Sequence, residues 1–154
     1  MPKLKAVYLV GTLKPSPETS NTYTLSEFLA KHLESHGVEN DIVRLIDYNI
    51  KPGAYTNVNN NSSNDDDWPT ILEKILASQI IIFATPVWWG NQSSLIQRVI
   101  ERLDEIHDEI MNTGRSRMTN KVAGIVVTGD SDGAEHIIGN LANFFISLGV
   151  LVII

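Results

Sequence analysis

Short apolar runs alternate along this chain with stretches in which apolar residues recur every three or four positions. Continuous apolar runs of strand length are typical of strands buried on both faces of a sheet. Helical spacing between such runs is typical of amphipathic helices. The pattern predicts five strands, at residues 4–10, 41–46, 79–84, 121–128 and 150–154.

Four helices are predicted between these strands. Gly37 ends the first helix, Asp67-Trp68-Pro69 opens the second with proline in the first turn, and the third follows Ser93. The fourth helix spans 134–148. The apolar stripes of the four helices lie between Leu25 and Leu33, Ile71 and Leu76, Ile96 and Ile106, and Ile137 and Leu148.

This alternation predicts one α/β domain over residues 1–154, a three-layer doubly wound parallel sheet with right-handed crossovers. Five strands favour the flavodoxin-like order 2-1-3-4-5. Ligands in such sheets bind beyond the carboxyl ends of the strands, at the topological switch point. The loops after the first, third and fourth strands are therefore the candidate site.

Composition narrows the chemistry. The 154 residues include no cysteine, which excludes disulfides, thiolate nucleophiles, cysteine-zinc sites and iron–sulfur clusters. A net charge of −6 with 12 scattered Lys and Arg disfavours a nucleic-acid partner. No apolar stretch has the length of a membrane span or the pattern of a signal peptide, so we expect a cytoplasmic protein.

The first loop, residues 11–22, offers several hydroxyls, the Asn21 amide, one lysine and the amino terminus of a helix. These are the groups that bind a phosphate monoester. A polar loop with an ordinary helix cap is the alternative, and both interpretations stay open at this point. The loop carries neither a Walker A motif nor a dinucleotide-binding glycine pattern.

The second loop, residues 85–93, contains two adjacent tryptophans, Trp88 and Trp89, next to a proline and a glycine. A flat isoalloxazine ring needs such apolar walls together with accessible backbone groups. Tryptophans of the core or of an interface are the alternative.

The third loop, residues 128–133, contains the string G-x-S-x-G of a hydrolase nucleophile elbow at Ser131. In hydrolases with this motif, the acidic residue and the histidine of the catalytic triad come from the ends of later strands. Here only Asp132, Glu135 and His136 follow, all within the next helical turn, which argues against an esterase. A receiver domain is excluded because the end of the third strand lacks an aspartate, as residues 84–86 read Ala-Thr-Pro.

Together the three loops resemble those of the NAD(P)H-dependent FMN reductase family of flavodoxin-like proteins. The matching segments are GTLKPSPETSNT, ATPVWWGNQSS and VTGDSDGAEHIIGN, and the resemblance spans nearly the whole chain. It implies that the FMN phosphate is held by Thr12, Lys14, Ser20, Asn21 and Thr22. It implies that the isoalloxazine lies against Pro86, Val87, Trp88, Trp89 and Gly90, with Thr128, Gly129, Asp130 and Gly133 on its other side.

The resemblance also implies a reaction. Members pass a hydride from NAD(P)H to flavin and then reduce a small acceptor such as a quinone, an azo compound or free flavin, so no catalytic side chain is required. His136 is a candidate for the acceptor pocket, and no metal is expected, since His32 and His36 have no third ligand nearby. A flavodoxin-type electron carrier, and a scaffold that holds no flavin, are the alternative functions.

Two departures from the family pattern matter. Lys14 stands where members commonly carry arginine, and members continue after the fifth strand into a last helix that is missing here. We therefore expect the sheet beside the first helix to be bare. A homo-oligomer covering that surface, or weakened flavin affinity, would follow.

Overall fold

The computed structural model describes residues 3–54, 65–129 and 132–153. Its five strands form one parallel sheet in the order β2-β1-β3-β4-β5, which confirms the predicted fold class. The strands are β1 (Lys5–Val10), β2 (Glu39–Arg44), β3 (Ile80–Pro86), β4 (Val122–Thr128) and β5 (Leu151–Ile153). The helices are α1 (Asn21–Ser35), α2 (Trp68–Ala77), α3 (Ser94–Arg102), α4 (Asp104–Thr113) and α5 (Ala134–Ser147), with a short 3-10 helix, η1 (Leu45–Asp47), after β2.

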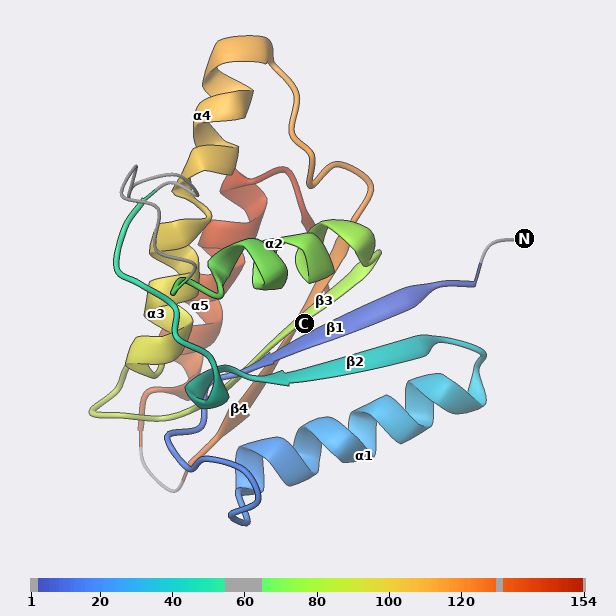
Figure 1. The fold of residues 1–154 in the computed structure, drawn as a ribbon, viewed down its shortest axis with the longest axis vertical. Helices are drawn as coiled ribbons and strands as arrows, with labels where there is room; N and C mark the ends of the chain where they lie inside the picture. The colour runs from blue at the N-terminus through green and yellow to red at the C-terminus, as the bar shows by residue number, and fades with distance from the viewer. Residues whose placement is uncertain (1–2, 55–64, 130–131, 154) are drawn as a thin grey trace.

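Helices cover the two faces of the sheet unequally. Figure 1 shows α1 on one side of the sheet and α2, α3 and α5 on the other. Because side chains alternate along a strand, β1 sends Val7 and Leu9 into the larger core under α2, α3 and α5. Ala6, Tyr8 and Val10 of the same strand face α1.

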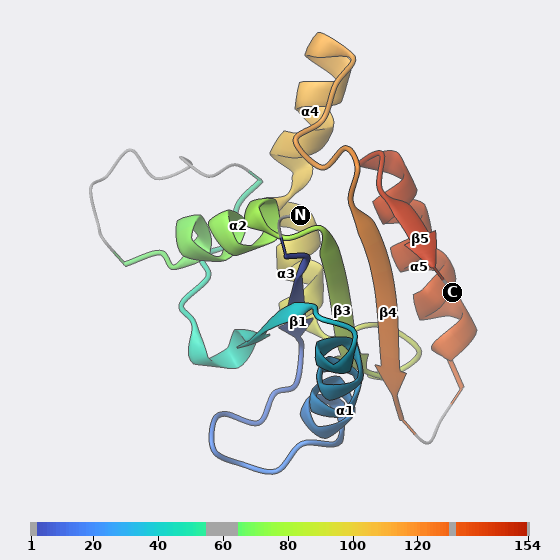
Figure 2. The ribbon, with the colours of Figure 1, turned by 90° about the vertical axis from the view of Figure 1, so that its right-hand side faces the viewer.

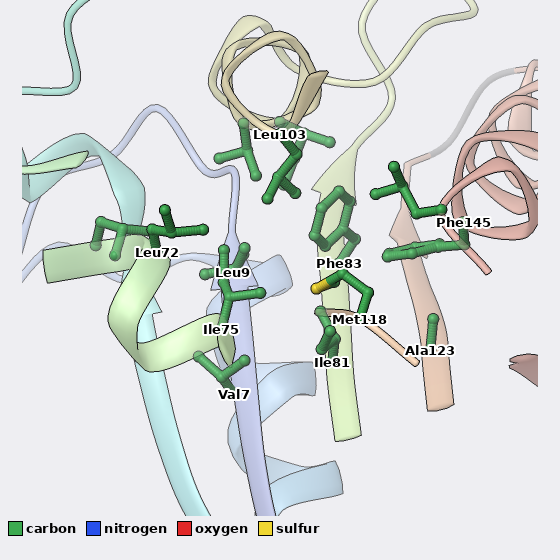
Figure 3. Packing of buried hydrophobic residues seen from close by; sticks show 14 of the residues in the cluster. Val7, Leu9, Leu72, Ile75, Ile81, Phe83, Leu103, Met118, Ala123 and Phe145 are labelled. Carbon is green, nitrogen blue, oxygen red and sulfur yellow. The ribbon is translucent and has the colours of Figure 1, made fainter. Parts of the chain in front are cut away.

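Aromatic rings occupy the centre of the larger core. Phe83 of β3 meets Phe145 of α5 edge-on, with 4.7 Å between ring centroids, and lies between α3 and α5 in Figure 3. Phe144 stacks on Phe83 at 6.1 Å. Pairs of this kind contribute about 0.5–1.5 kcal/mol beyond the area that they bury. They fix α5 against β3 and so fix where the third loop ends.

The predicted third helix is in fact two helices, α3 and α4, that meet at Leu103. The apolar period continues through the break, since Ile96, Val99, Leu103 and Ile106 are all buried. Asp104 begins the first turn of α4, where the positive end of the helix dipole stabilises acidic side chains. Beyond this point α4 projects away from the sheet (Figure 2).

Helix α1 packs through small residues. Thr22, Ser26 and Ala30 face the sheet, whereas Leu25 and Phe28 of the apolar stripe are exposed. Small side chains allow the helix to approach the strands closely. The predicted helix is confirmed, but its most apolar side chains do not form its buried face.

Beside α1, the uncovered part of the sheet forms an apolar groove of about 570 Å³. Leu29 and Leu33 of α1 form one wall, and Ile80, Val126 and Ile153 of the sheet are among the residues on the other side. Among the described residues, apolar sheet surface next to α1 is therefore open.

The polar segment Asn57–Asp67 lies outside the described residues from 57 to 64. Its described end is tied to α3, because the buried guanidinium of Arg102 lies 3.1 Å from a carboxylate oxygen of Asp66. The same guanidinium donates to the carbonyl oxygen of Lys51 at 3.3 Å and lies over the ring of Trp68. These contacts anchor both ends of the connection between η1 and α2.

Candidate cofactor-binding site

The three predicted loops meet around one cavity at the carboxyl ends of β1, β3 and β4. Its volume is about 540 Å³, within the usual range for small-molecule sites. The lining residues are Thr12, Leu13, Lys14, Ser20, Asn21 and Thr22 from the first loop and the start of α1, Pro86, Val87 and Trp88 from the second loop, and Thr128 and Gly129 from the third.

Backbone hydrogen bonds continue the sheet into these loops. Gly11 N–H donates to the carbonyl oxygen of Ala84 at 2.7 Å, which joins the first loop to the end of β3. Val87 N–H donates to the carbonyl oxygen of Thr128 at 2.8 Å, which joins the second loop to the third. The floor of the cavity is thus an extension of the parallel ladder.

Two glycines let the loops approach closely. A Cβ on Gly11 would lie 2.5 Å from Oγ of Ser93. A Cβ on Gly133 would lie 2.5 Å from Cα of Gly90, and Gly133 has a φ of 124°, which side chains disfavour. Backbone of the third loop therefore packs directly on backbone of the second.

The first loop and the start of α1 bring hydrogen-bonding groups to the cavity. Ser20 caps α1, where its Oγ accepts from Tyr23 N–H at 3.3 Å, and Asn21 and Thr22, the first two residues of this helix, line the cavity. Hydroxyl oxygens of Thr22 and Thr128 lie 2.7 Å apart and join α1 to β4. Lys14 carries the only formal charge among the described lining residues. An anionic group is the ligand that these residues suit.

The second loop lines the cavity with apolar residues, Pro86, Val87 and Trp88. Trp88 and Asn91 exchange backbone hydrogen bonds of 2.8 and 2.9 Å across a two-residue turn. Trp89 and Gly90, the central residues of that turn, both have positive φ, 50° and 77°, as a type I′ turn requires. The turn leaves Trp88 half exposed at the cavity and Trp89 almost completely exposed beyond it.

Most of the residues predicted for the site lie together. Those that line the cavity are Thr12, Lys14, Ser20, Asn21, Thr22, Pro86, Val87, Trp88, Thr128 and Gly129. Trp89 and Gly90 belong to the adjoining turn, and Gly133 packs on Gly90. His136 is exposed on α5 and is not a lining residue, and the prediction for Asp130 lies outside the described residues, as does Ser131.

Sequence reasoning missed Leu13, which lines the cavity although it is partly exposed. Its only signal is an apolar residue within an otherwise polar loop. In the described ranges, no group of three His, Cys, Asp or Glu side chains could hold a metal ion. Among the same residues, every helix is too short or too polar to cross a membrane.

Comparison with known proteins places the chain near flavin-related proteins. The 8-demethyl-8-aminoriboflavin-5'-phosphate synthase of Streptomyces davaonensis is 32% identical over 151 residues, 95% of this chain and 59% of the relative. The divalent metal cation transporter MntH of Mycobacterium bovis is 32% identical over 133 residues, 86% of this chain and only 19% of that protein. The chain therefore spans three fifths or less of these relatives.

The crystal structure of RosB with bound 8-demethyl-8-formylriboflavin-5'-phosphate is similar over 97% of this chain and 61% of that chain, with a TM-score of 0.84 and 32% identity. The model of the NADPH-dependent FMN reductase family matches residues 4–153. A match of that length, over a site with the expected arrangement, leads to one conclusion. The chain belongs to the NADPH-dependent FMN reductase family of flavodoxin-like flavoproteins, whose cofactor is FMN and whose electron donor is NAD(P)H.

Proposed function

We propose that the cavity binds FMN, with the phosphate at the first loop and the isoalloxazine against the second and third. The observation that carries the proposal is one cavity of about 540 Å³ whose lining combines hydrogen-bond donors from the first loop with apolar side chains from the second. FMN needs both kinds of lining, because it has a dianionic phosphate on a flexible chain and a flat, largely apolar ring.

The phosphate end fits the charge of the group. A phosphate monoester carries about −1.5 to −2 charges near neutral pH. Lys14 supplies one positive charge, and the amino terminus of α1 supplies about half a charge more. Buried hydroxyls of Thr12, Ser20 and Thr22 provide hydrogen bonds. The phosphate would be held mainly by neutral donors, in keeping with the scarcity of basic residues.

The ring end fits a planar group. Gly129 lies at the cavity, and a Cβ at this position would lie 2.9 Å from Cγ2 of Val87, so only glycine lets the third loop come this close to the second. We propose that the ring lies along this pair of loops, with Trp88 at its edge and backbone N–H and C=O groups facing its polar atoms.

We propose that the protein is an FMN-dependent oxidoreductase that takes electrons from NAD(P)H and delivers them to a small acceptor, such as a quinone, an azo compound or free flavin. Bound FMN supplies the redox chemistry by accepting two electrons and releasing them again. The chain's own residues bind and orient the reactants. No histidine or carboxylate is among the described lining residues, so none of those side chains has to move a proton.

The rim of the cavity bears on the acceptor. Leu13, Trp88 and Trp89 are exposed apolar side chains on two of the loops around the cavity mouth. Such a rim favours a flat apolar acceptor over a highly charged one. We also propose a homo-oligomer over the groove beside α1 and a cytoplasmic location.

A second candidate function is favoured by the relatives. One of them is named as a synthase of a riboflavin 5'-phosphate derivative, and the RosB structure holds another such derivative. At 32% identity, a flavin phosphate that is substrate rather than resident cofactor is the alternative for this cavity.

The two functions can be separated by experiment. Purified protein is loaded with FMN and supplied with NADPH or NADH and a quinone, and nucleotide oxidation is followed at 340 nm. The flavin is then extracted and its mass is measured. The oxidoreductase proposal predicts many turnovers per FMN and an unchanged flavin mass. A second sample contains an amino donor in addition. No nucleotide oxidation in the first sample, together with a changed flavin mass in the second, would favour the flavin-modifying function.

A further inference from the structure

The first loop has little internal structure of its own. Residues 11–20 form neither helix nor strand, and the loop's own hydrogen bonds include one from Glu18 N–H to the carbonyl oxygen of Pro15, at 2.8 Å. Lys14 Nζ reaches the carbonyl oxygen of Thr19 at 3.1 Å. The shape of this loop therefore depends on what holds it from outside.

Arg44, the last residue of β2, provides one such contact. Its side chain is buried, and one terminal nitrogen donates to the carbonyl oxygens of Lys14, Pro15 and Glu18 at 3.3, 2.9 and 2.9 Å. The guanidinium carbon lies 4.1 Å from the ring centroid of Tyr23, in the first turn of α1. A single cation thus joins the loop to the start of the helix whose first residues line the cavity.

Asp47, at the end of η1, provides the second contact. One carboxylate oxygen accepts from Ser16 N–H at 3.0 Å, and the other accepts from the Ser16 hydroxyl at 2.6 Å. These hydrogen bonds from Ser16 hold the pKa of Asp47 below its ordinary value. The carboxylate therefore remains charged and bound to the loop at any pH near neutrality.

The two contacts act on the same peptide unit. The carbonyl between Pro15 and Ser16 binds Arg44, and the N–H of that planar unit binds Asp47. Arg44 also fixes the carbonyl of Lys14, whose side chain lines the cavity, although neither Arg44 nor Asp47 lines it. The negative ends of three peptide dipoles are thereby bound to a guanidinium that lies outside the cavity.

We propose that Arg44 and Asp47 are positioning residues for the 5'-phosphate, which hold the first loop in its receiving shape before the ligand binds. The inference rests on the proposed FMN function. A loop that is already ordered loses less conformational freedom when it binds, so its affinity for phosphate is higher. The buried guanidinium adds a positive charge behind the loop. Lysine cannot replace it, because an ammonium group lacks the planar face that stacks on Tyr23.

The test compares two ligands that differ only in the phosphate. Dissociation constants for FMN and for riboflavin are measured by quenching of flavin fluorescence with the wild type, Arg44→Lys and Asp47→Asn. Arg98→Lys is the matched control, because Arg98 also donates to a backbone carbonyl, that of Ile50 at 3.0 Å, and does not line the cavity. Ser16→Ala, at an exposed position, removes only the hydroxyl bond to Asp47.

We expect Arg44→Lys and Asp47→Asn to weaken FMN binding about tenfold or more, the effect of losing one or two charge-assisted hydrogen bonds. Riboflavin binding should change less than about twofold, and Arg98→Lys should change neither ligand. Ser16→Ala should show a smaller loss for FMN alone. A role in general stability would instead weaken both flavins to the same extent, and that result would overturn the inference.

The inference and the function that it rests on fail in different ways. Wild type that shows no preference for FMN over riboflavin would refute the phosphate assignment of the cavity itself. Wild type that prefers FMN, with variants that keep the same preference, would refute only the positioning role. If Arg44→Lys does not fold, Asp47→Asn and Ser16→Ala decide the question in the same way.

Discussion

Replacing Gly133 by alanine tests whether the second and third loops are in direct backbone contact. The new Cβ would lie 2.5 Å from Cα and 3.0 Å from the carbonyl carbon of Gly90, so backbone, which cannot rotate away as a side chain can, has to move. In addition, Gly133 has a φ of 124°, outside the region that alanine normally occupies. Both effects act against the native structure of the cavity.

The expected magnitude follows from these two effects. A non-glycine residue in such a conformation costs about 1–3 kcal/mol. Relief of the overlap by a shift of the loops costs about another 1–3 kcal/mol. We therefore expect Gly133→Ala to lower the free energy of unfolding by about 2–6 kcal/mol. The displaced loops should also weaken FMN binding in whatever fraction remains folded.

The same substitution elsewhere provides the control. Gly139 lies inside α5, and no heavy atom lies within 4 Å of the position that a Cβ would take. Alanine is a better helix former than glycine, so Gly139→Ala should raise the free energy of unfolding by about 0.5–1 kcal/mol.

Urea denaturation, followed by circular dichroism without flavin, measures both changes, provided that the slope of free energy against urea is unchanged. If the free energy of unfolding of Gly133→Ala lies within about 0.5 kcal/mol of the wild-type value, the second and third loops are not in the backbone contact described above, and the cavity does not have this shape.

Three further changes address the cavity and its support. Lys14→Met should weaken FMN binding and leave riboflavin binding unchanged, because Lys14 is the only charged residue among the described lining residues; fluorescence titration measures both. Trp89→Ala should change the free energy of unfolding by less than about 0.5 kcal/mol, since the side chain is 97% exposed, yet raise the KM for a quinone, which steady-state kinetics measures. The pKa of Asp47 in the folded protein is lowered from 3.8, so the charged carboxylate contributes its full stabilisation above that pH, and the contribution is lost as the pH falls through the lower pKa of the folded state. In urea denaturation, the free energy of unfolding of the wild type should therefore exceed that of Asp47→Asn near neutral pH, and the difference should shrink below about pH 4.

Much of the fold could be predicted because buried parallel strands have a simple signature. Val7 and Leu9 on one face of β1, and Tyr8 and Val10 on the other, belong to one continuous apolar run, and burial on both faces follows from the chain's alternation of strands and helices. Once the strands are parallel, the loops at their carboxyl ends must be neighbours. Most of the residues that line the cavity could therefore be predicted from that rule together with the resemblance to a family.

Other features depend on contacts that periodicity does not record. The break at Leu103 interrupts no apolar period, and only the acidic pair after it signals a new helix. Leu25 and Phe28 have helical spacing, but the smaller Ser26 and Ala30 form the buried face of α1. Which face of a helix packs depends on how closely the backbone approaches the sheet, and the sequence alone does not state this distance.

Arg44 could not have been assigned for a related reason. Its partner in the sheet is Val10, the last residue of β1, so the register of β1 and β2 brings Arg44 beside the start of the first loop. The sequence favours a strand order, but it does not give the register of one strand against the next. A lone arginine at the end of a short strand therefore carries no signal until the sheet is assembled.

The most direct test of the central claim is a visible absorption spectrum of the purified protein after incubation with FMN and desalting. We predict a retained flavin band near 450 nm at about one FMN per chain, and a weaker retained band when Lys14→Met is treated in the same way. A folded wild-type protein with no retained band, and no FMN binding at equilibrium by fluorescence titration, would contradict the assignment of this cavity to FMN.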